Sequence, residues 1–108
     1  MIILFKEISS NFEKLGLPKY QSSALAVIHS EKEPTALTIS QKGNIPYTKV
    51  YETLTNLNYM GFIVSSLERP KKYKLTDLNF IVESLIEKQK NNYYEVKKQA
   101  RTVIKVLN

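Results

Sequence analysis

The sequence predicts a mainly α (α+β) protein in which short helices, a two-stranded hairpin and a long C-terminal helix follow one another. Up to residue 61, apolar residues recur at spacings of three and four, within segments that Gly or Pro interrupts. Two β-rich runs, "FIVSSL" and "KKYKL", then flank "ERPK". From residue 71 onward the chain has neither Gly nor Pro. A short helix, a tight turn, a second helix and a hairpin in this order predict a winged helix-turn-helix, with the hairpin as its wing.

Two helices are expected before residue 31. The run "LFKEISSNFEKLG" has helical apolar spacing, and Gly16 is suited to end it. The run "LPKYQSSALAVIHS" restarts a helix near Pro18. "EKEP" then predicts a turn, and "TAL" has room for only a very short strand.

The helix-turn-helix itself is expected between residues 38 and 61. "TISQK" forms its short first helix, closed by Gly43-Asn44, because both residues tolerate left-handed backbone angles. Pro46 opens the second helix, and Gly61 ends it. The inward face of the second helix is predicted to consist of Val50, Leu54 and Leu57.

The long C-terminal helix is expected to start after Thr76-Asp77, two good N-cap residues. In its later part the apolar residues alternate spacings of three and four, as a coiled-coil seam requires. Two consecutive spacings of four, at Gln89, form a stutter that locally relaxes a supercoil. The candidate dimerisation residues are Leu78, Val82, Leu85, Gln89, Tyr93, Val96, Ala100, Val103 and Leu107.

The charge balance indicates a polyanionic partner. Sixteen Lys and Arg against ten Asp and Glu give the 108-residue chain a net charge of +6, with a pI of about 9.5. Such an excess favours nucleic acid or an anionic membrane surface. The long helix mixes Glu with Lys and offers a narrow seam, which disfavours a membrane binder. The chain has no cysteine, which fits a reducing compartment, and we expect a cytoplasmic protein.

A winged helix-turn-helix brings the start of its second helix to the base edges of the major groove. Thr48 can donate to a phosphate or a base, Lys49 supplies charge, and Tyr47 can pack on a sugar. The alternative is that these are solvated surface residues of a helix that only packs. The basic hairpin tip and the first helix add phosphate contacts, although a lysine-rich hairpin also guards a sheet edge. The candidate DNA-binding residues are Thr38, Gln41, Lys42, Tyr47, Thr48, Lys49, Arg69, Lys71, Lys72 and Lys74.

No catalytic or metal-binding pattern is present in the sequence. It contains no phosphate-binding loop, no metalloprotease motif and no credible catalytic triad. His29 is the only histidine, and without cysteine a metal site is improbable. We therefore expect a protein that is not an enzyme and that has no cofactor.

Three stretches resemble a known family. "LGLPKYQSSALAVI", "TALTISQKGNIPYTKVYETLTNLNYMGFI" and "RPKKYKL" are similar, in this order, to the DNA-binding domain of the TrmB-like regulators, transcription factors found mainly in archaea. The resemblance implies a winged-helix regulator that binds operator DNA as a dimer. It also implies a role for each short segment: Ile45-Pro46 as the turn before the recognition helix, Tyr47, Thr48 and Lys49 as its DNA-facing start, Val50-Tyr51 as its anchoring pair, and residues 69–73 as the wing.

The chain departs from the family pattern in two places. Leu37 stands where a polar helix cap is usual, which predicts that the first helix starts one residue later, at Thr38. TrmB-like proteins also commonly carry a large C-terminal domain that senses sugars, whereas a single long helix follows the wing here. We do not expect sugar sensing to carry over.

These observations predict a homodimeric DNA-binding regulator of transcription. Residues 1–76 would form the winged helix-turn-helix DNA-binding domain with its extra N-terminal helix, and residues 77–108 the dimerisation helix. A two-fold dimer would bind a pseudo-palindrome with half-sites about 34 Å apart. One alternative is an architectural, chromatin-like protein, for which operator and random DNA compete equally. The other is a protein-interaction module, which would not bind duplex DNA even at low salt.

Overall fold

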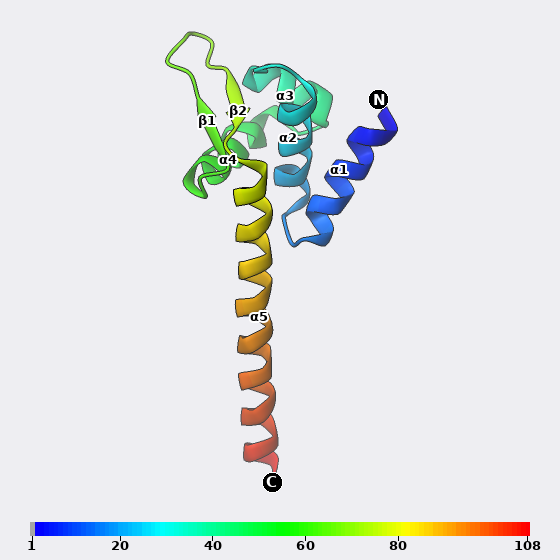
Figure 1. The fold of residues 1–108 in the computed structure, drawn as a ribbon, viewed down its shortest axis with the longest axis vertical. Coiled ribbons are helices and arrows are strands. Elements are labelled where there is room, and N and C mark those ends of the chain that lie inside the picture. The colour runs from blue at the N-terminus through cyan, green and yellow to red at the C-terminus, as the bar shows by residue number, and fades with distance from the viewer. Residues whose placement is uncertain (1) are drawn as a thin grey trace.

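The computed structural model describes residues 2–108, with side chains from residue 4 onward. Its elements are α1 (Ile2–Lys14), α2 (Lys19–Ser30), α3 (Ala36–Gly43), α4 (Tyr47–Tyr59), β1 (Ile63–Ser65), β2 (Tyr73–Leu75) and α5 (Leu78–Leu107). Helices α1–α4 and the hairpin, here called the winged unit, gather at one end of a molecule measuring 60 × 30 × 28 Å (Figure 1). Helix α5 runs away from this unit. The winged helix-turn-helix and the long C-terminal helix are thus confirmed.

Helix α2 is the central element of the winged unit. All its residues from Ser22 to Ile28 are buried, and it packs against α1, α3, α4 and β2. A helix that is apolar on most of its faces is stable only when other elements surround it. The inward face of α4 completes this core, with Val50, Leu54 and Leu57 all buried, as the spacing predicts.

Two glycines end helices, in agreement with the sequence. After α1, Gly16 adopts φ +104°, while Leu17 N–H bonds to Phe12 O and Gly16 N–H to Glu13 O. After α4, Gly61 adopts φ +78°. At both helix ends the glycine has a left-handed backbone conformation, which only glycine adopts at no steric cost. In both cases the following N–H groups bond to carbonyls of the last turn.

The start of α3 corrects two expectations. The helix begins at Ala36, not at Thr38, and Thr35 caps it by accepting the N–H of Thr38 at 3.3 Å. The polar cap is therefore Thr35, two residues before Leu37. The strand expected at "TAL" is reduced to a single bridge between Thr35 and Lys72. At the end of α3 only Asn44 is left-handed, with φ 54°.

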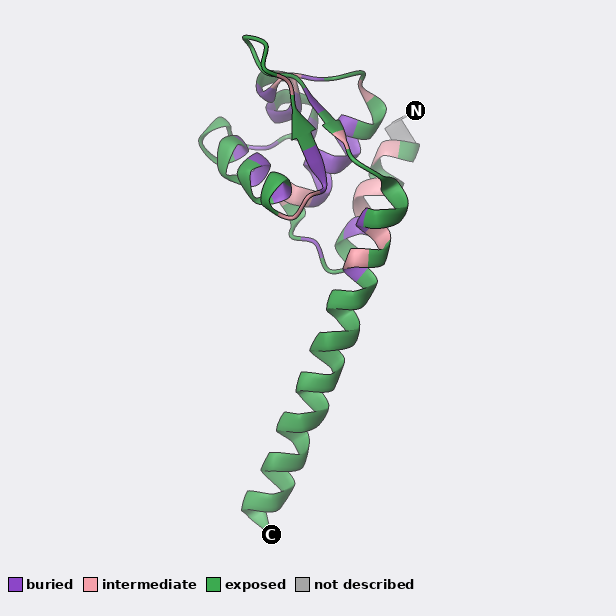
Figure 2. Ribbon diagram, turned by 60° about the vertical axis from the view of Figure 1, so that its left-hand side comes forward, coloured by how far each residue is buried: buried purple, intermediate pink, exposed green. Residues whose placement is uncertain are grey.

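The hairpin and α5 follow the predicted order. Strands β1 and β2 pair antiparallel, with Val64 opposite Lys74. Asp77 caps α5 by accepting the N–H of Asn79 at 3.0 Å. Ile81 and Leu85 are buried in the core of the winged unit, whereas every residue from 86 to 108 is exposed (Figure 2). Among residues 2–108, no helix has the length and apolar character needed to cross a membrane.

Candidate nucleic-acid interface

A cleft of about 510 Å³ lies between α4, the start of α3 and the hairpin. Helix α4 lines it with Tyr47, Tyr51 and Thr55, which recur every four residues and so share one face of the helix. The hairpin lines the other side with Arg69 and Lys71. The cleft thus combines an aromatic, hydroxyl-bearing wall with a basic wall.

Two tyrosines dominate the wall from α4. The rings of Tyr47 and Tyr51 meet edge to face, with centroids 5.7 Å apart and an interplanar angle of 89°. Their hydroxyls are hydrogen bonded at 3.2 Å. This hydrogen bond is the main cause that raises the pKa of Tyr47, and the electrostatic effect of Tyr51 is the second cause. Both side chains are about half exposed, so their hydroxyls remain accessible to a ligand.

Tyr73 of β2 lies beneath the same cleft. Its side chain is buried and belongs to the core cluster. Burial is the main cause that raises the pKa of Tyr73, and the nearby Tyr51 adds to it. Because its ring joins the hairpin to the core, Tyr73 positions the basic wall of the cleft.

Tyr51 is the residue whose place the sequence-based interpretation assigned wrongly. The resemblance paired it with Val50 as an anchor of the recognition helix. Val50 is fully buried, but Tyr51 is 53% exposed and points into the cleft. Its spacing of four from the exposed Tyr47 is the signal that could have shown this.

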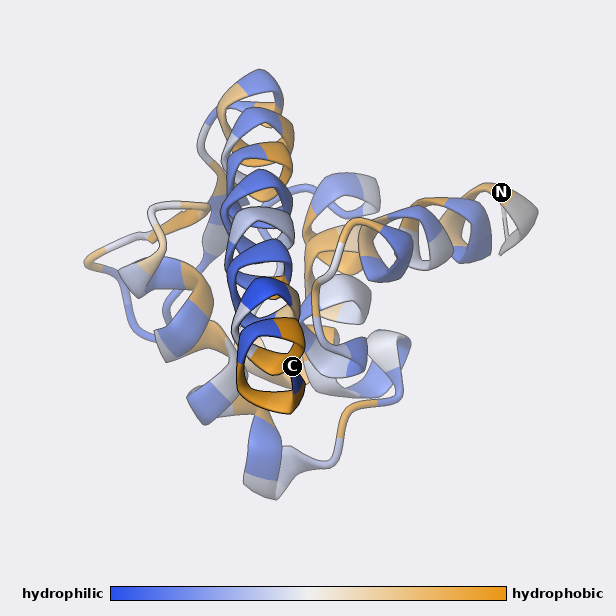
Figure 3. Ribbon diagram, turned by 90° about the horizontal axis from the view of Figure 1, so that it is seen from below, coloured by the Kyte–Doolittle hydropathy of each residue, from blue (hydrophilic) through white to orange (hydrophobic). Residues whose placement is uncertain are grey.

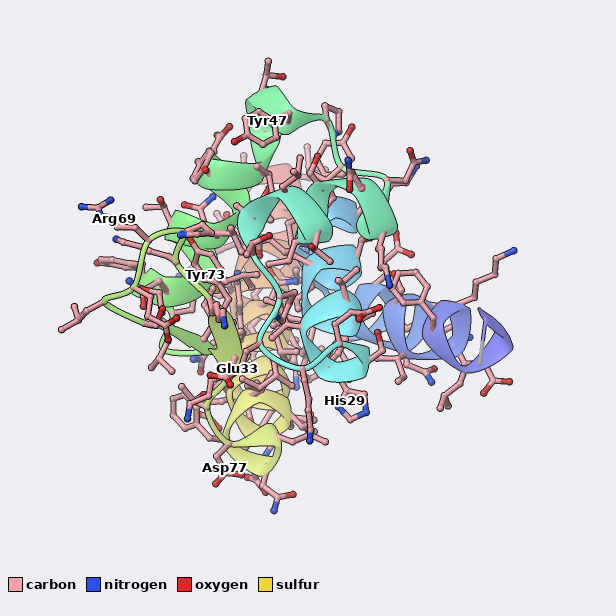
Figure 4. All side chains as sticks on the ribbon, turned by 90° about the horizontal axis from the view of Figure 1, so that it is seen from above. His29, Glu33, Tyr47, Arg69, Tyr73 and Asp77 are labelled. Atoms are coloured by element: carbon pink, nitrogen blue, oxygen red, sulfur yellow. The ribbon has the colours of Figure 1, made fainter. Side chains whose placement is uncertain are left out.

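The wing presents basic side chains of two kinds. Lys72 pairs with Glu68 at 3.7 Å. Within residues 2–108, Arg69, Lys71 and Lys74 have no acidic partner within ion-pair distance. Arg69 extends outward from the hairpin (Figure 4). Free guanidinium and ammonium groups of this kind suit phosphate oxygens.

At the start of α4, Thr48 and Lys49 are exposed as predicted. Lys49 lies 3.9 Å from Glu52, in a pair that solvent surrounds. Such exposed pairs contribute at most about 1 kcal/mol, so a phosphate can replace the carboxylate. Two α3 candidates also have partners, because Lys42 pairs with Glu31 and Thr38 takes part in the cap of α3. Gln41 is exposed at the surface.

The candidate dimerisation residues separate into two groups. Leu85 is buried in the core of the winged unit, and Gln89 donates to the carbonyl of Leu15 at 3.0 Å. Leu78 is exposed and Val82 is half-buried. The five distal seam residues are all exposed: Tyr93, Val96, Ala100, Val103 and Leu107.

His29 is exposed at the end of α2. Over the part of the chain that the structure describes, no group of three or more His, Asp and Glu side chains is arranged to hold a metal ion.

Residues 12–79 match the model of the family described as sugar-specific transcriptional regulator TrmB. The chain belongs to the TrmB family. Among its relatives is the HTH-type sugar sensing transcriptional regulator TrmBL1 of Pyrococcus furiosus, 27% identical over 85 residues. The aligned part covers 79% of this TrmB-family chain and 25% of TrmBL1, so the chain spans about a quarter of that relative.

Several solved structures share the fold. TrmBL2, described as an archaeal chromatin protein, matches with a TM-score of 0.74 and 15% identity over 95% of this chain and 41% of its own. An S. aureus MepR mutant bound to an oligodeoxyribonucleotide matches with a TM-score of 0.58 and 16% identity, over 94% and 86% of the two chains. The Zalpha domain of Carassius auratus PKZ, in complex with Z-DNA, matches with a TM-score of 0.51 and 21% identity, over 54% and 94%. These likenesses establish that the TrmB-family chain is a winged helix.

Proposed function

We propose that this chain is a DNA-binding regulator of transcription that contacts duplex DNA with α4 and the hairpin. The observation that supports it most is the cleft in which the exposed Tyr47 and Tyr51 face Arg69 and Lys71. An aromatic wall opposite free cations suits a polyanion with flat bases. Membership of a family of transcriptional regulators supports the regulatory role.

In the proposed complex, the start of α4 enters the major groove. Thr48 and the tyrosine hydroxyls reach base edges or phosphates, and the N–H groups of Tyr47 and Thr48 at the start of α4 attract phosphate. Arg69 and Lys71 bind the sugar-phosphate backbone from the wing, which fixes the register of α4 on the duplex. Base contacts then supply specificity, whereas the wing supplies affinity that depends on salt.

We propose further that the protein acts as a homodimer through α5. The distal seam residues are apolar and exposed over several turns, and such a seam is stable in water when a second helix covers it. Nearer the winged unit, Leu78 and Val82 line an apolar hollow of about 290 Å³ together with Ile8 of α1 and Leu15, which follows α1. The hollow continues the seam and suits an apolar side chain of the second copy. A two-fold dimer would address half-sites about 34 Å apart.

The deciding experiment is selection of bound sequences from a random duplex library at moderate salt, with random DNA as competitor. Enrichment of a pseudo-palindrome supports the proposal. Failure to bind duplex DNA at low salt overturns it, and a protein partner that co-purifies would then indicate an interaction module.

Two single substitutions test the assignment of contacts. Lys71→Ala should weaken binding to all duplexes similarly and lower the salt slope by about 0.9, because one phosphate contact is lost. Thr48→Ala should weaken binding to the selected site by more than binding to random DNA, if Thr48 reads a base. Equal losses on both duplexes would remove Thr48 from the base-reading residues.

A sequence-tolerant architectural protein is the second candidate function. The likeness to TrmBL2, described as an archaeal chromatin protein, favours it. In that case the library selection would show tight binding without an enriched motif, and random DNA would compete fully.

A further inference from the structure

The net positive charge of this protein is concentrated on the exposed distal part of α5. Residues 1–87, which include the whole winged unit, hold ten basic and nine acidic side chains. Residues 88–108 hold six basic side chains and one acidic side chain. Nearly all of the net charge of +6 therefore lies on a segment in which every residue is exposed. This segment lies outside the winged unit, and its charge suits a polyanionic ligand.

Five of these side chains share one face of the helix. With about 3.6 residues per turn, they fall within an arc of roughly 100° and extend over about 22 Å of the helix. Within the described residues, none of the five makes an ion pair. The acidic residue, Glu95, lies outside the arc. We call this set the basic stripe: Lys90, Lys97, Lys98, Arg101 and Lys105.

The basic stripe and the apolar seam occupy different faces. Hydrophobic and hydrophilic residues are both visible along the distal turns of α5 when the helix is viewed from its C-terminal end (Figure 3). In heptad terms the seam residues take positions a and d, while Lys98, Arg101 and Lys105 take the outer positions b and f. Lys90 and Lys97 take position e beside the seam, where the Lys97 ammonium lies 5.4 Å from the centroid of the Tyr93 ring. A second copy that covers the seam therefore leaves Lys98, Arg101 and Lys105 exposed. Positions g, such as Gln99 and Val106, carry no charge and cannot pair with the stripe across a parallel dimer.

We infer that the basic stripe is a second DNA-binding surface, which takes the backbone of a duplex segment other than the one at α4 and the hairpin. The hairpin and the C-terminus lie at opposite ends of the 60 Å molecule, so the stripe lies away from the duplex proposed beside α4 and the hairpin (Figure 1). Duplex DNA carries one negative charge per about 1.7 Å, so every cation in a straight row of five over about 22 Å can meet a phosphate. The protein would thus hold two duplex segments together. The inference rests on the proposed function for the first segment.

The test is a bridging assay with residues 1–108. A biotinylated duplex carrying a selected site is fixed on beads and loaded with protein, and retention of a second, fluorescent duplex is measured. The stripe variant carries Lys90→Gln, Lys97→Gln, Lys98→Gln, Arg101→Gln and Lys105→Gln, because Gln keeps the helix propensity high. The matched control loses the same charge away from the stripe, through Lys6→Gln, Lys14→Gln, Lys19→Gln, Lys32→Gln and Lys88→Gln.

The wild type and the control should retain the second duplex, and the stripe variant should retain about tenfold less at moderate salt. Its affinity for the single fixed duplex should change little. Equal retention by the stripe variant and the control overturns the inference, because bridging then comes from two winged units of one dimer. The inference is also overturned if the wild type binds the fixed duplex but retains no second duplex. That result leaves the proposed function intact. If none of the three proteins binds a duplex, both this inference and the proposed function are overturned.

A second readout does not depend on the multiple substitution. A photo-crosslinking amino acid at Tyr94, which lies within the arc of the stripe and is exposed, should attach to the fluorescent duplex. The same group at Val106, outside the arc, should not. Crosslinking to anionic vesicles or to an acidic protein, with none to the second duplex, assigns the stripe to another partner and overturns the inference.

Discussion

At the scale of residues, two buried serines hold the turn that aims α4. The Ser23 hydroxyl donates to the carbonyl of Gly43 at 2.6 Å, and the Ser40 hydroxyl donates to the carbonyl of Ile45 at 2.6 Å. Ile45 is itself buried, and Pro46 follows as the N-cap of α4. Because buried carbonyls are costly to leave without a partner, these hydroxyls fix the path of the chain between α3 and α4.

Ser40→Ala should therefore lower the free energy of unfolding by about 1–3 kcal/mol, since the carbonyl of Ile45 loses the Ser40 donor. Chemical denaturation of the two proteins measures this difference. Ser65→Ala, at an exposed position of β1, serves as the control and should change stability by no more than about 0.5 kcal/mol. Equal effects of the two substitutions would contradict the role of Ser40.

Tyr73 makes stability depend on pH in the alkaline range. Its pKa is raised mainly by burial, so the folded protein keeps the phenolic proton at a pH where the unfolded chain has released it. Stability from this residue is fully present below the unfolded pKa of about 10 and is lost as pH rises beyond it. Urea unfolding at pH 9 and pH 11 should show a smaller loss for Tyr73→Phe than for the wild type.

Tyr59→Phe is the control for this comparison, because Tyr59 is 92% exposed. It should lose as much stability between the two pH values as the wild type does. A Tyr73→Phe protein that loses just as much would show that Tyr73 is not the cause.

At the scale of elements, α5 belongs partly to the winged unit. Ile81 and Leu85 enter the core, and Phe80 meets Phe62 of the turn before β1 edge to face, with centroids 6.2 Å apart. The seam pattern selected Leu85 for pairing with a second copy, and it passed over Ile81. The first turns of α5 pack on the core, and the later turns are exposed. The apolar residues of this one helix therefore follow a core-packing pattern first and a seam pattern afterwards. The periodicity alone does not say where one pattern replaces the other.

Ile81→Ala should cost about 2–5 kcal/mol of unfolding free energy, because it leaves a cavity in a fully buried site. Leu67→Ala, on the wing, should cost little, since Leu67 is 99% exposed. Denaturant unfolding followed by circular dichroism measures both. A small effect of Ile81→Ala would mean that the first turns of α5 do not stabilise the winged unit.

At the scale of the whole molecule, shape separates two tasks. The winged unit brings together the tyrosines of α4 and the free cations of the hairpin at one end. The rest of α5 leaves the unit with an apolar seam on one face and the basic stripe on another. Self-association through the seam would pair two winged units and also place Lys98, Arg101 and Lys105 of each stripe on the outside of the helix pair.

Val103→Glu should weaken self-association at least about tenfold, because it places a charge in the apolar seam. Sedimentation equilibrium measures the dissociation constant. Thr102→Glu introduces the same charge at the neighbouring residue, outside the seam, and should leave the dissociation constant nearly unchanged. If both variants associate as the wild type does, the distal seam is not the dimer interface.

The order of the elements and the winged helix-turn-helix class follow from the amino-acid sequence alone. Periodicity, the helix-ending Gly16 and Gly61, Pro46 before α4 and the cap at Asp77 are short-range signals, and each acts on residues within a turn or two along the chain. For the same reason the inward face of α4 and the membership of the TrmB-like family could be read from the residues alone.

How these elements pack against one another could not be predicted from the sequence. The cap of α3 at Thr35, the cleft position of Tyr51, the burial of Ile81 and the pairing of Lys42 with Glu31 all depend on the three-dimensional packing. Burial and ion pairing are properties of a side chain and its neighbours in space, many of which are distant in sequence. A local pattern does not contain them, and the structure was needed to show which basic residues of the winged unit are free.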